Sequence, residues 1–273
     1  MAKSGIENDS LLLVEVSGTP TAVAGSARFY TKSDNLPYFQ DGAGVERSLL
    51  VTSMDQGQVY DHAQTVLTID TASTWHAEGG NGNWSSEKLA GWTFVDGTTA
   101  TAVTVYASAD GGAATTVTAA GHGLSNDDQC TISGSTNYNN TGTIAHSVTN
   151  VSGNDFEINV AFAGDDAAGN VSRGPYLLAG ADAAGEYGIH MHQSAGQPGG
   201  ASQEVETSVF LNADQISNLQ YHREYAAGGD VGAAAVSAIQ TIAASDRLWL
   251  AARNLTGTND KTNEHFLMYL RRA

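Results

Sequence analysis

Apolar and polar residues alternate in short runs along most of this chain, as they do in β-strands that bury one face. Clusters of Gly, Asn, Asp and Ser separate the runs and are typical of tight turns. The Ala-rich stretch 233–244 also contains Val and Ile and fits a strand and a loop equally well. We therefore predict an all-β fold. The clearest strand patterns lie at 66–69, 185–192, 247–252 and 265–270.

Differences in strand pattern and residue composition divide the chain into three regions. Residues 1–58 contain short runs at 11–16, 25–32, 36–39 and 45–51 joined by polar turns, and they predict a β-hairpin segment that pairs with another copy or docks on a partner. Residues 98–175 show strand patterns at 115–118, 129–132, 142–148 and 155–160 with turn clusters between them, which predicts a small β-barrel. The flanking stretches 59–97 and 176–273 carry all four tryptophans and predict one sandwich that the barrel interrupts.

The net charge and the cysteine content limit which partners and which compartment we expect for this protein. The formal net charge is −17, so the surface repels phosphates and nucleic acid is not an expected partner. Cys130 is the only cysteine, which excludes an intramolecular disulfide and favours assembly in a reducing host cytoplasm with release by lysis. The sequence has no apolar run of about 18 residues and no secretion-signal core, so we expect no membrane partner.

The middle region carries a distinctive order of turn and strand residues. It resembles a small β module frequent in phage virion proteins, related in pattern to the first catalytic-cysteine half-domain of ubiquitin-activating enzymes. The resemblance implies a structural module, because the cysteine chemistry of those enzymes occurs elsewhere. Cys130 is accordingly expected to be a small buried hydrophobe and not a reactive thiol. The matching residues are 117–125, 130–139, 148–158 and 161–169.

The flanking sandwich carries a looser pattern at 184–192, 245–250 and 266–270. It is similar to the trimeric jelly rolls of the tumour necrosis factor and complement globular-head superfamily. This similarity implies a jelly-roll-like fold and a homotrimer, not a receptor identity, since the long basic receptor stretch is missing. Residues 25–44 resemble a short repeat in phage tail-fibre and head-fibre proteins.

The terminal strand pattern also predicts a trimer contact. Apolar side chains occur on both faces of 266–270, and an interface between copies would bury the outward set. Phe266 and Tyr269 are the expected interface residues.

Catalytic motifs are missing from the sequence. It contains no Gly-x-Ser-x-Gly elbow, no phosphate loop ending in Lys and no His-Glu-x-x-His. Glu204 and Glu206 are a carboxylate pair on an expected strand, but a glycosidase would also need a groove around them. We therefore expect no enzyme, no catalytic residue and no cofactor.

Metal ligands are equally sparse. His190 and His192 alternate on one expected strand and could bind an ion together, yet no third ligand follows nearby, so a polar strand face or a trimer-interface pair is favoured. The pairs Asp165–Asp166 and Asn259–Asp260 lack the spacing of a calcium loop, and His122 belongs to a Gly-His-Gly turn. No metal is expected.

The tryptophans give the best candidate for a recognition surface. Trp75, Trp84 and Trp92 flank the Gly-rich stretch 79–83, where exposed rings could stack on a sugar. Burial in the sandwich core is the favoured reading for these rings. Trp75 and Trp84 are nevertheless the residues we would expect to contact a host surface glycan.

Together these patterns predict a trimeric structural protein on the exterior of a tailed-phage virion. The segment 1–58 would dock on the major capsid protein or another virion protein, the sandwich would trimerise, and the module would project outward. Capsid decoration or head fibre is preferred over tail fibre because the sequence has no long repetitive shaft. A contribution to host attachment is compatible with this role. The alternatives are a carbohydrate-binding adhesin module and, more remotely, a glycan-degrading tailspike.

Overall fold

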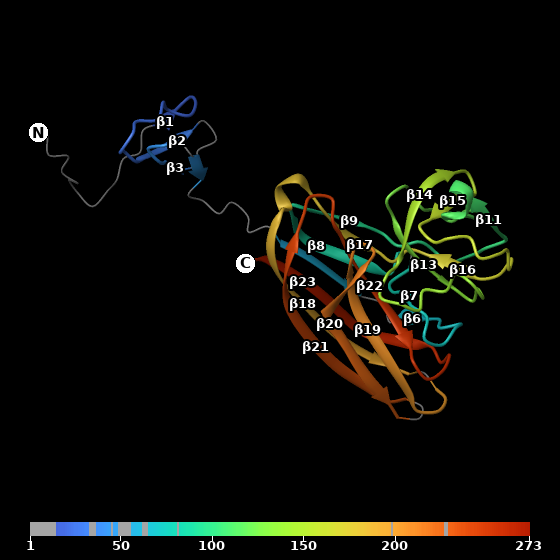
Figure 1. Cartoon of the computed structure of the whole chain (residues 1–273). Helices are drawn as coiled ribbons and strands as arrows, with labels where there is room; N and C mark the ends of the chain where they lie inside the picture. The colour runs from blue at the N-terminus through green and yellow to red at the C-terminus, as the bar shows by residue number, and fades with distance from the viewer. Residues whose placement is uncertain are drawn as a thin grey trace, which may run out of the picture. The chain divides into compact units, whose positions relative to one another are not determined.

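The computed structural model describes residues 15–32, 37–44, 46–48, 56–61, 65–80, 82–197, 199–226 and 229–273. Strands make up nearly all of the regular structure, with two short 3₁₀ turns at Asp110–Gly112 and Ala181–Ala183, so the predicted all-β class is confirmed. The chain divides into two compact units, 1–54 and 55–273 (Figure 1). Among the described residues, no helix is long and apolar enough to cross a membrane.

The N-terminal unit contains a four-stranded sheet in the order β1-β2-β3-β4. The predicted hairpin is the antiparallel pair of β2 and β3. The flanking strands β1, which is parallel to β2, and β4 lie within the runs predicted at 11–16 and 45–51. Tyr30 is buried and donates a hydrogen bond to Glu46, which ties β2 to β4. Parts of the predicted runs at 11–16 and 45–51 lie outside the described residues. The strands are β1 (Glu15–Val16), β2 (Arg28–Lys32), β3 (Pro37–Gln40) and β4 (Glu46–Ser48).

The second unit is built around a sandwich of two sheets. One sheet has the order β21-β18-β23-β5-β8, with β6 paired to β23, and the other has the order β20-β19-β22-β17-β9, with β7 paired to β22. The first sheet contains β5 (Gln56–Asp61), β6 (Thr65–Leu67), β8 (Trp84–Ala90), β18 (Gly185–Gly196), β21 (Val231–Ile242) and β23 (Lys261–Arg272). The second contains β7 (His76–Ala77), β9 (Trp92–Val95), β17 (Tyr176–Ala179), β19 (Gln203–Leu211), β20 (Asp214–Tyr225) and β22 (Arg247–Asn254).

The connectivity of the long strands is that of a jelly roll. When β5 and β17 to β23 are counted as strands one to eight, the sheets read 1-8-3-6 and 2-7-4-5. Each sheet therefore receives strands from both halves of the sequence, and two Greek keys close on one core. Strand β5 begins at Gln56, so residues 56–58 lie in the sandwich although their sequence pattern had placed them in the N-terminal segment.

Strand alternation explains how the core forms. Along β18, Tyr187, Ile189 and Met191 point inward and are buried, whereas the residues between them point to the outer face. Aromatic pairs strengthen the packing: the rings of Trp84 and Phe266 stack with centroids 4.5 Å apart. Each such side chain contributes about 1.5–3 kcal/mol by leaving water.

The inserted module enters and leaves the sandwich between β9 and β17. These two strands pair antiparallel, so their ends at the insertion lie side by side and the second sheet continues without a break. Figure 1 shows the module beside the part of the sandwich that carries β6 and β7. The insertion is therefore compatible with an intact jelly roll.

The module is a small barrel with its own core. Its sheet has the order β10-β16-β13-β14-β15-β12-β11, and the continuous run 101–109 supplies both end strands, so the backbone itself closes the sheet. Cys130 is completely buried in this core. The strand predicted at 142–148 begins only at His146. The strands are β10 (Thr101–Ala102), β11 (Val105–Ala109), β12 (Ala114–Thr118), β13 (Gln129–Ser133), β14 (His146–Ser152), β15 (Asp155–Ile158) and β16 (Asn170–Ser172).

Candidate functional site

The two tryptophans expected to contact a glycan lie inside the protein. Trp75 is 1% exposed and Trp84 is 4% exposed. The Trp75 indole donates a hydrogen bond to the Gly142 carbonyl at 2.6 Å, and its ring packs edge-on against Phe210. Neither ring offers a face to a sugar in solution, so the structure corrects this expectation in favour of core packing.

The two expected interface residues separate onto opposite faces of β23. Phe266 has no exposed surface and belongs to the sandwich core, so the structure corrects its assignment to an interface. Tyr269 lies on the outer face, where its ring stacks with His190 at a centroid distance of 6.2 Å. Only Tyr269 is therefore placed where another copy can reach it.

The carboxylates considered for catalysis or for calcium binding form hydrogen bonds and ion pairs with other groups of the protein. Glu206 is buried and forms an ion pair with Arg253 at 2.8 Å, while Glu204 is exposed beside His222. Asp165 accepts a hydrogen bond from the backbone N–H of Tyr106. These contacts stabilise strands and turns.

Other candidates also have local structural partners. Asp166 accepts hydrogen bonds from Ser135 and from the backbone of Thr136, and Asp260 accepts one from the backbone of Ile69. The His122 ring accepts a hydrogen bond from the backbone of Leu124 within its own turn. Burial and, secondarily, Asp128 raise the pKa of the Cys130 thiol, which keeps it protonated.

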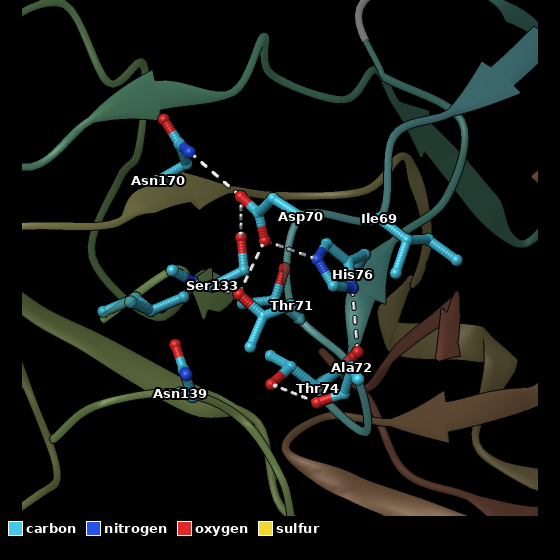
Figure 2. A network of polar contacts seen from close by, with 12 residues as sticks. Ile69, Asp70, Thr71, Ala72, Thr74, His76, Ser133, Asn139 and Asn170 are labelled. Carbon is cyan, nitrogen blue, oxygen red and sulfur yellow. Dashed lines mark hydrogen bonds and ion pairs between the residues drawn. The ribbon is translucent and has the colours of Figure 1, made fainter. Parts of the chain in front are cut away.

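A polar network joins the module to the sandwich, with Asp70 at its centre (Figure 2). The Oδ1 atom of Asp70 lies 2.9 Å from Nε2 of His76, and Oδ2 accepts hydrogen bonds from Ser133 at 2.9 Å and Asn170 at 3.0 Å. Ser133 and Asn170 belong to module strands β13 and β16, whereas Asp70 and His76 belong to the 68–77 segment of the sandwich. One carboxylate therefore connects two cores.

The hydrogen bonds lower the pKa of the Asp70 carboxyl. Burial alone would raise the pKa of the Asp70 carboxyl, but hydrogen bonds from His76, Asn170 and Ser133 outweigh it and hold the pKa well below its usual range. Nδ1 of His76 lies 2.8 Å from the Thr74 carbonyl, which can only accept. Both ring nitrogens of His76 are therefore engaged by neighbouring oxygen atoms.

A cavity of about 360 Å³ opens beside the network. Ser133, His76 and Asp70 are the residue types of a nucleophilic triad, but the carboxylate lies between the hydroxyl and the imidazole. His76 has no free ring nitrogen with which to accept the Ser133 proton, so the arrangement does not activate a nucleophile. The network instead connects the module to the sandwich. The cavity is lined by polar and apolar side chains, among them Asn83, Asn263, Val66 and Leu67.

The outer face of the first sheet has a different character. We define this outer face by the outward residues of β21, β18 and β23, and Val231 and Ile239 on it are 51% and 67% exposed. Its charged side chains, Glu186, Glu264 and Arg271, lie toward the ends of its strands, although the chain is strongly acidic. The other outward residues include Val231, Ala233, Ala235, Ser237, Ile239 and Thr241 of β21, His190, His192 and Ser194 of β18, and His265, Leu267 and Tyr269 of β23.

This face could have been found in the sequence. Every second residue from 231 to 241 is small, β-branched or hydroxyl-bearing, and none is charged. Such alternation would have identified an edge strand with an uncharged outward side. The stretch 233–244, which fitted a strand and a loop equally well, forms most of that strand.

No protein-family model matches the chain, and no curated protein matches it in sequence.

Proposed function

We propose that this protein is a homotrimeric structural component on the exterior of a tailed-phage particle, a capsid decoration or head fibre in preference to a tail fibre. In this role the N-terminal unit docks on the major capsid protein or another virion protein. The jelly roll assembles three copies, and the barrel module supplies additional surface.

The outer face of β21, β18 and β23 is the observation that carries this proposal. A protein with a net charge of −17 repels its own copies, and a partly apolar face with few charged side chains is where that repulsion is weakest. Long apolar edge strands are usually blunted by charge or covered, and β21 is a 12-residue edge strand with no charged side chain. Contact with further copies of the chain would cover this edge strand.

Two further features support the role. The division into compact units at residues 54 and 55 separates a small sheet from the jelly roll, as an attachment segment requires. The sequence resemblances of residues 25–44 and of the module are to phage structural proteins. The chemistry of the junction, with its carboxylate and imidazole fully engaged, favours a mechanical role over catalysis.

The mass of the protein in solution tests the assembly. Light scattering on the full chain should give about 85 kDa, the mass of three 28.3 kDa chains. A chain starting at Asp55 should give a trimer as well, because the outer face lies in the second unit. A monomer in both forms would contradict the assembly. Antibody against the protein should label intact particles of the virus that encodes it, and unlabelled particles would contradict the exterior location.

A further inference from the structure

We propose that His190 and His192 of neighbouring copies together bind a divalent transition-metal ion where the outer faces meet. This inference rests on the self-assembly proposed above and names a ligand for the same surface. It goes beyond that proposal because assembly alone requires no metal.

The two imidazoles share one face and are available to a ligand. Alternate residues of a strand point to the same side, about 6.6–6.8 Å apart, and both rings are exposed on β18. Neither ring forms a hydrogen bond or an ion pair with the described part of the chain. The contact that His190 does make, with the Tyr269 ring, orients the imidazole and leaves both nitrogens free.

The surroundings favour an ion held by nitrogen ligands. In the paired strands, His190 stands between Ser237 and Tyr269, and His192 stands between Ala235 and Leu267. None of these four neighbours is charged; Arg271 lies on the same face, opposite Gly188, two positions from His190 along the strand. Imidazole nitrogen suits Zn²⁺, Ni²⁺ and Cu²⁺, whereas Ca²⁺ and Mg²⁺ prefer oxygen.

A third imidazole lies on the same face. His265 is exposed and pairs with Ser194, two residues beyond His192, so it is the diagonal neighbour of His192 across β23. Within one copy the described residues bring no three His, Cys, Asp or Glu side chains close enough to hold a metal ion. One copy therefore offers an incomplete site, and the missing ligands must come from another copy.

Other copies related by symmetry would supply the missing ligands. Two copies would present four imidazoles from positions 190 and 192, and three copies would present six, which satisfies four- or six-fold coordination. His190 and His192 stand midway along β18, which is itself the middle strand of the face. Three strands of 12 residues cover roughly 550 Å² in projection, a large part of the about 800 Å² that each partner of a standard interface buries. A cation at the centre would also offset repulsion between acidic copies.

Zinc is the probe for the experiment, and the full chain is used after treatment with EDTA. Titration calorimetry should show fewer than one Zn²⁺ per chain, because the site is shared. Light scattering on a dilution series should show that zinc lowers the concentration at which the assembly dissociates by at least tenfold. EDTA should reverse this effect.

The variant His190→Gln/His192→Gln should lose zinc binding and the zinc-dependent shift. His222→Gln is the matched control, because His222 is an exposed strand histidine on the opposite sheet, and it should keep both. Circular dichroism checks that the variants fold. If the double variant fails to fold, the EDTA reversal and the stoichiometry of the unmodified chain still decide the question.

Each contrary result has a distinct meaning. A wild-type trimer that binds no zinc overturns the metal site and leaves the proposed function standing. One Zn²⁺ bound per monomer overturns the shared site. Loss of zinc binding in His222→Gln, with binding retained in the double variant, places the ion on the other sheet and overturns the assignment. A monomer that ignores zinc overturns both proposals.

Discussion

The Nζ atom of Lys261 lies 2.6 Å from Oε1 of Glu78, and neither side chain is exposed to solvent. Thr207 Oγ1 lies 2.8 Å from Nζ, while the amides of Asn263 and Gln193 each donate to Oε2 of Glu78 at 2.9 Å. Burial lowers the pKa of Lys261 and the neighbouring Glu78 opposes that shift. The pair joins the segment that follows β7 to the first residue of β23.

Lys261→Met should be strongly destabilising, because it leaves the Glu78 carboxylate buried without its partner. Breaking one side of a buried pair costs about 3–5 kcal/mol, and the free energy of unfolding from urea denaturation measures it. The double variant Lys261→Met/Glu78→Gln removes both charges and should lose clearly less. Equal losses in the single and double variants would show that the uncompensated charge is not the cause.

His146 should make the stability of the protein pH-dependent. Its Nε2–H donates to the Tyr138 carbonyl at 2.7 Å, and burial lowers the pKa of His146 to about 4, with that hydrogen bond opposing the shift. The unfolded chain, with an ordinary pKa of about 6.5, then binds the proton more readily. Stability should therefore fall as the pH falls from about 6.5 to about 4, by roughly 3 kcal/mol from this group.

The comparison with His146→Gln isolates this effect, since glutamine keeps a donor for the Tyr138 carbonyl but does not titrate. Urea denaturation at several pH values should give a flatter dependence between pH 6.5 and 4 for the variant. An unchanged slope would contradict the assignment of this window to His146.

Asp70 should act in a more acidic window. Its folded pKa lies below the ordinary value of about 3.9, so its contribution is present above that pH and is lost as the pH falls through it toward the folded pKa. Asp70→Asn should cost about 1–3 kcal/mol at pH 7, because His76, Ser133 and Asn170 lose their shared acceptor. The acid loss below about pH 4 should then be smaller than in the wild type.

Asp155→Asn is the control for this prediction. Asp155 is exposed on β15 and accepts one hydrogen bond from Thr118, at 2.7 Å. Its replacement should change the free energy of unfolding by no more than about 0.5 kcal/mol. A loss in Asp155→Asn as large as that in Asp70→Asn would deny the Asp70 network a special role.

The strands were largely predictable because alternation is a local signal. The runs at 185–192, 247–252 and 265–270 all lie in strands, which extend beyond the predicted ends because pairing with neighbours continues there. Glycine and Asx clusters likewise identified the turns of the module. The short strands β10 and β16 were missed because two or three residues carry no readable period.

The junction could not be predicted, because its residues are distant in sequence. Asp70 is separated from Ser133 by 63 positions and from Asn170 by 100, so no local spacing points to their contact. Burial of Trp75 depends in the same way on Phe210 and on Arg253, whose guanidinium lies 4.5 Å from the indole ring. Long-range packing alone decides whether an aromatic residue in a turn is exposed.

Gly79 should resist replacement more than a neighbouring glycine. It has φ of +95°, and a Cβ there would lie 2.5 Å from Cε2 of Trp84 and 2.7 Å from Cγ of Pro175. Gly79→Ala should therefore cost about 3 kcal/mol or more, from backbone strain and a clash in the packed core. Gly82→Ala shares a positive φ but meets open space, and it should cost only about 1–2 kcal/mol. Equal thermal shifts would contradict the steric argument.

Ile239→Glu should dissociate the assembly without unfolding the chain. Ile239 is 67% exposed on the outer face, so its replacement removes little from the core and should change the stability of one copy by about 0.5 kcal/mol or less. In an interface, the new carboxylate would be removed from water and would face its equivalents in the other copies. Light scattering should give the mass of one chain for the variant where the wild type gives three.

Ser217→Glu provides the matched control, because Ser217 is exposed on β20, the edge strand of the opposite sheet. It adds the same charge on a similar edge and should leave the trimer mass unchanged. If Ile239→Glu stays trimeric and Ser217→Glu dissociates, the copies meet through the second sheet. The edge strand β20 would then replace β21 as the contact between copies, and the outer face of β21, β18 and β23 would not be the trimer interface.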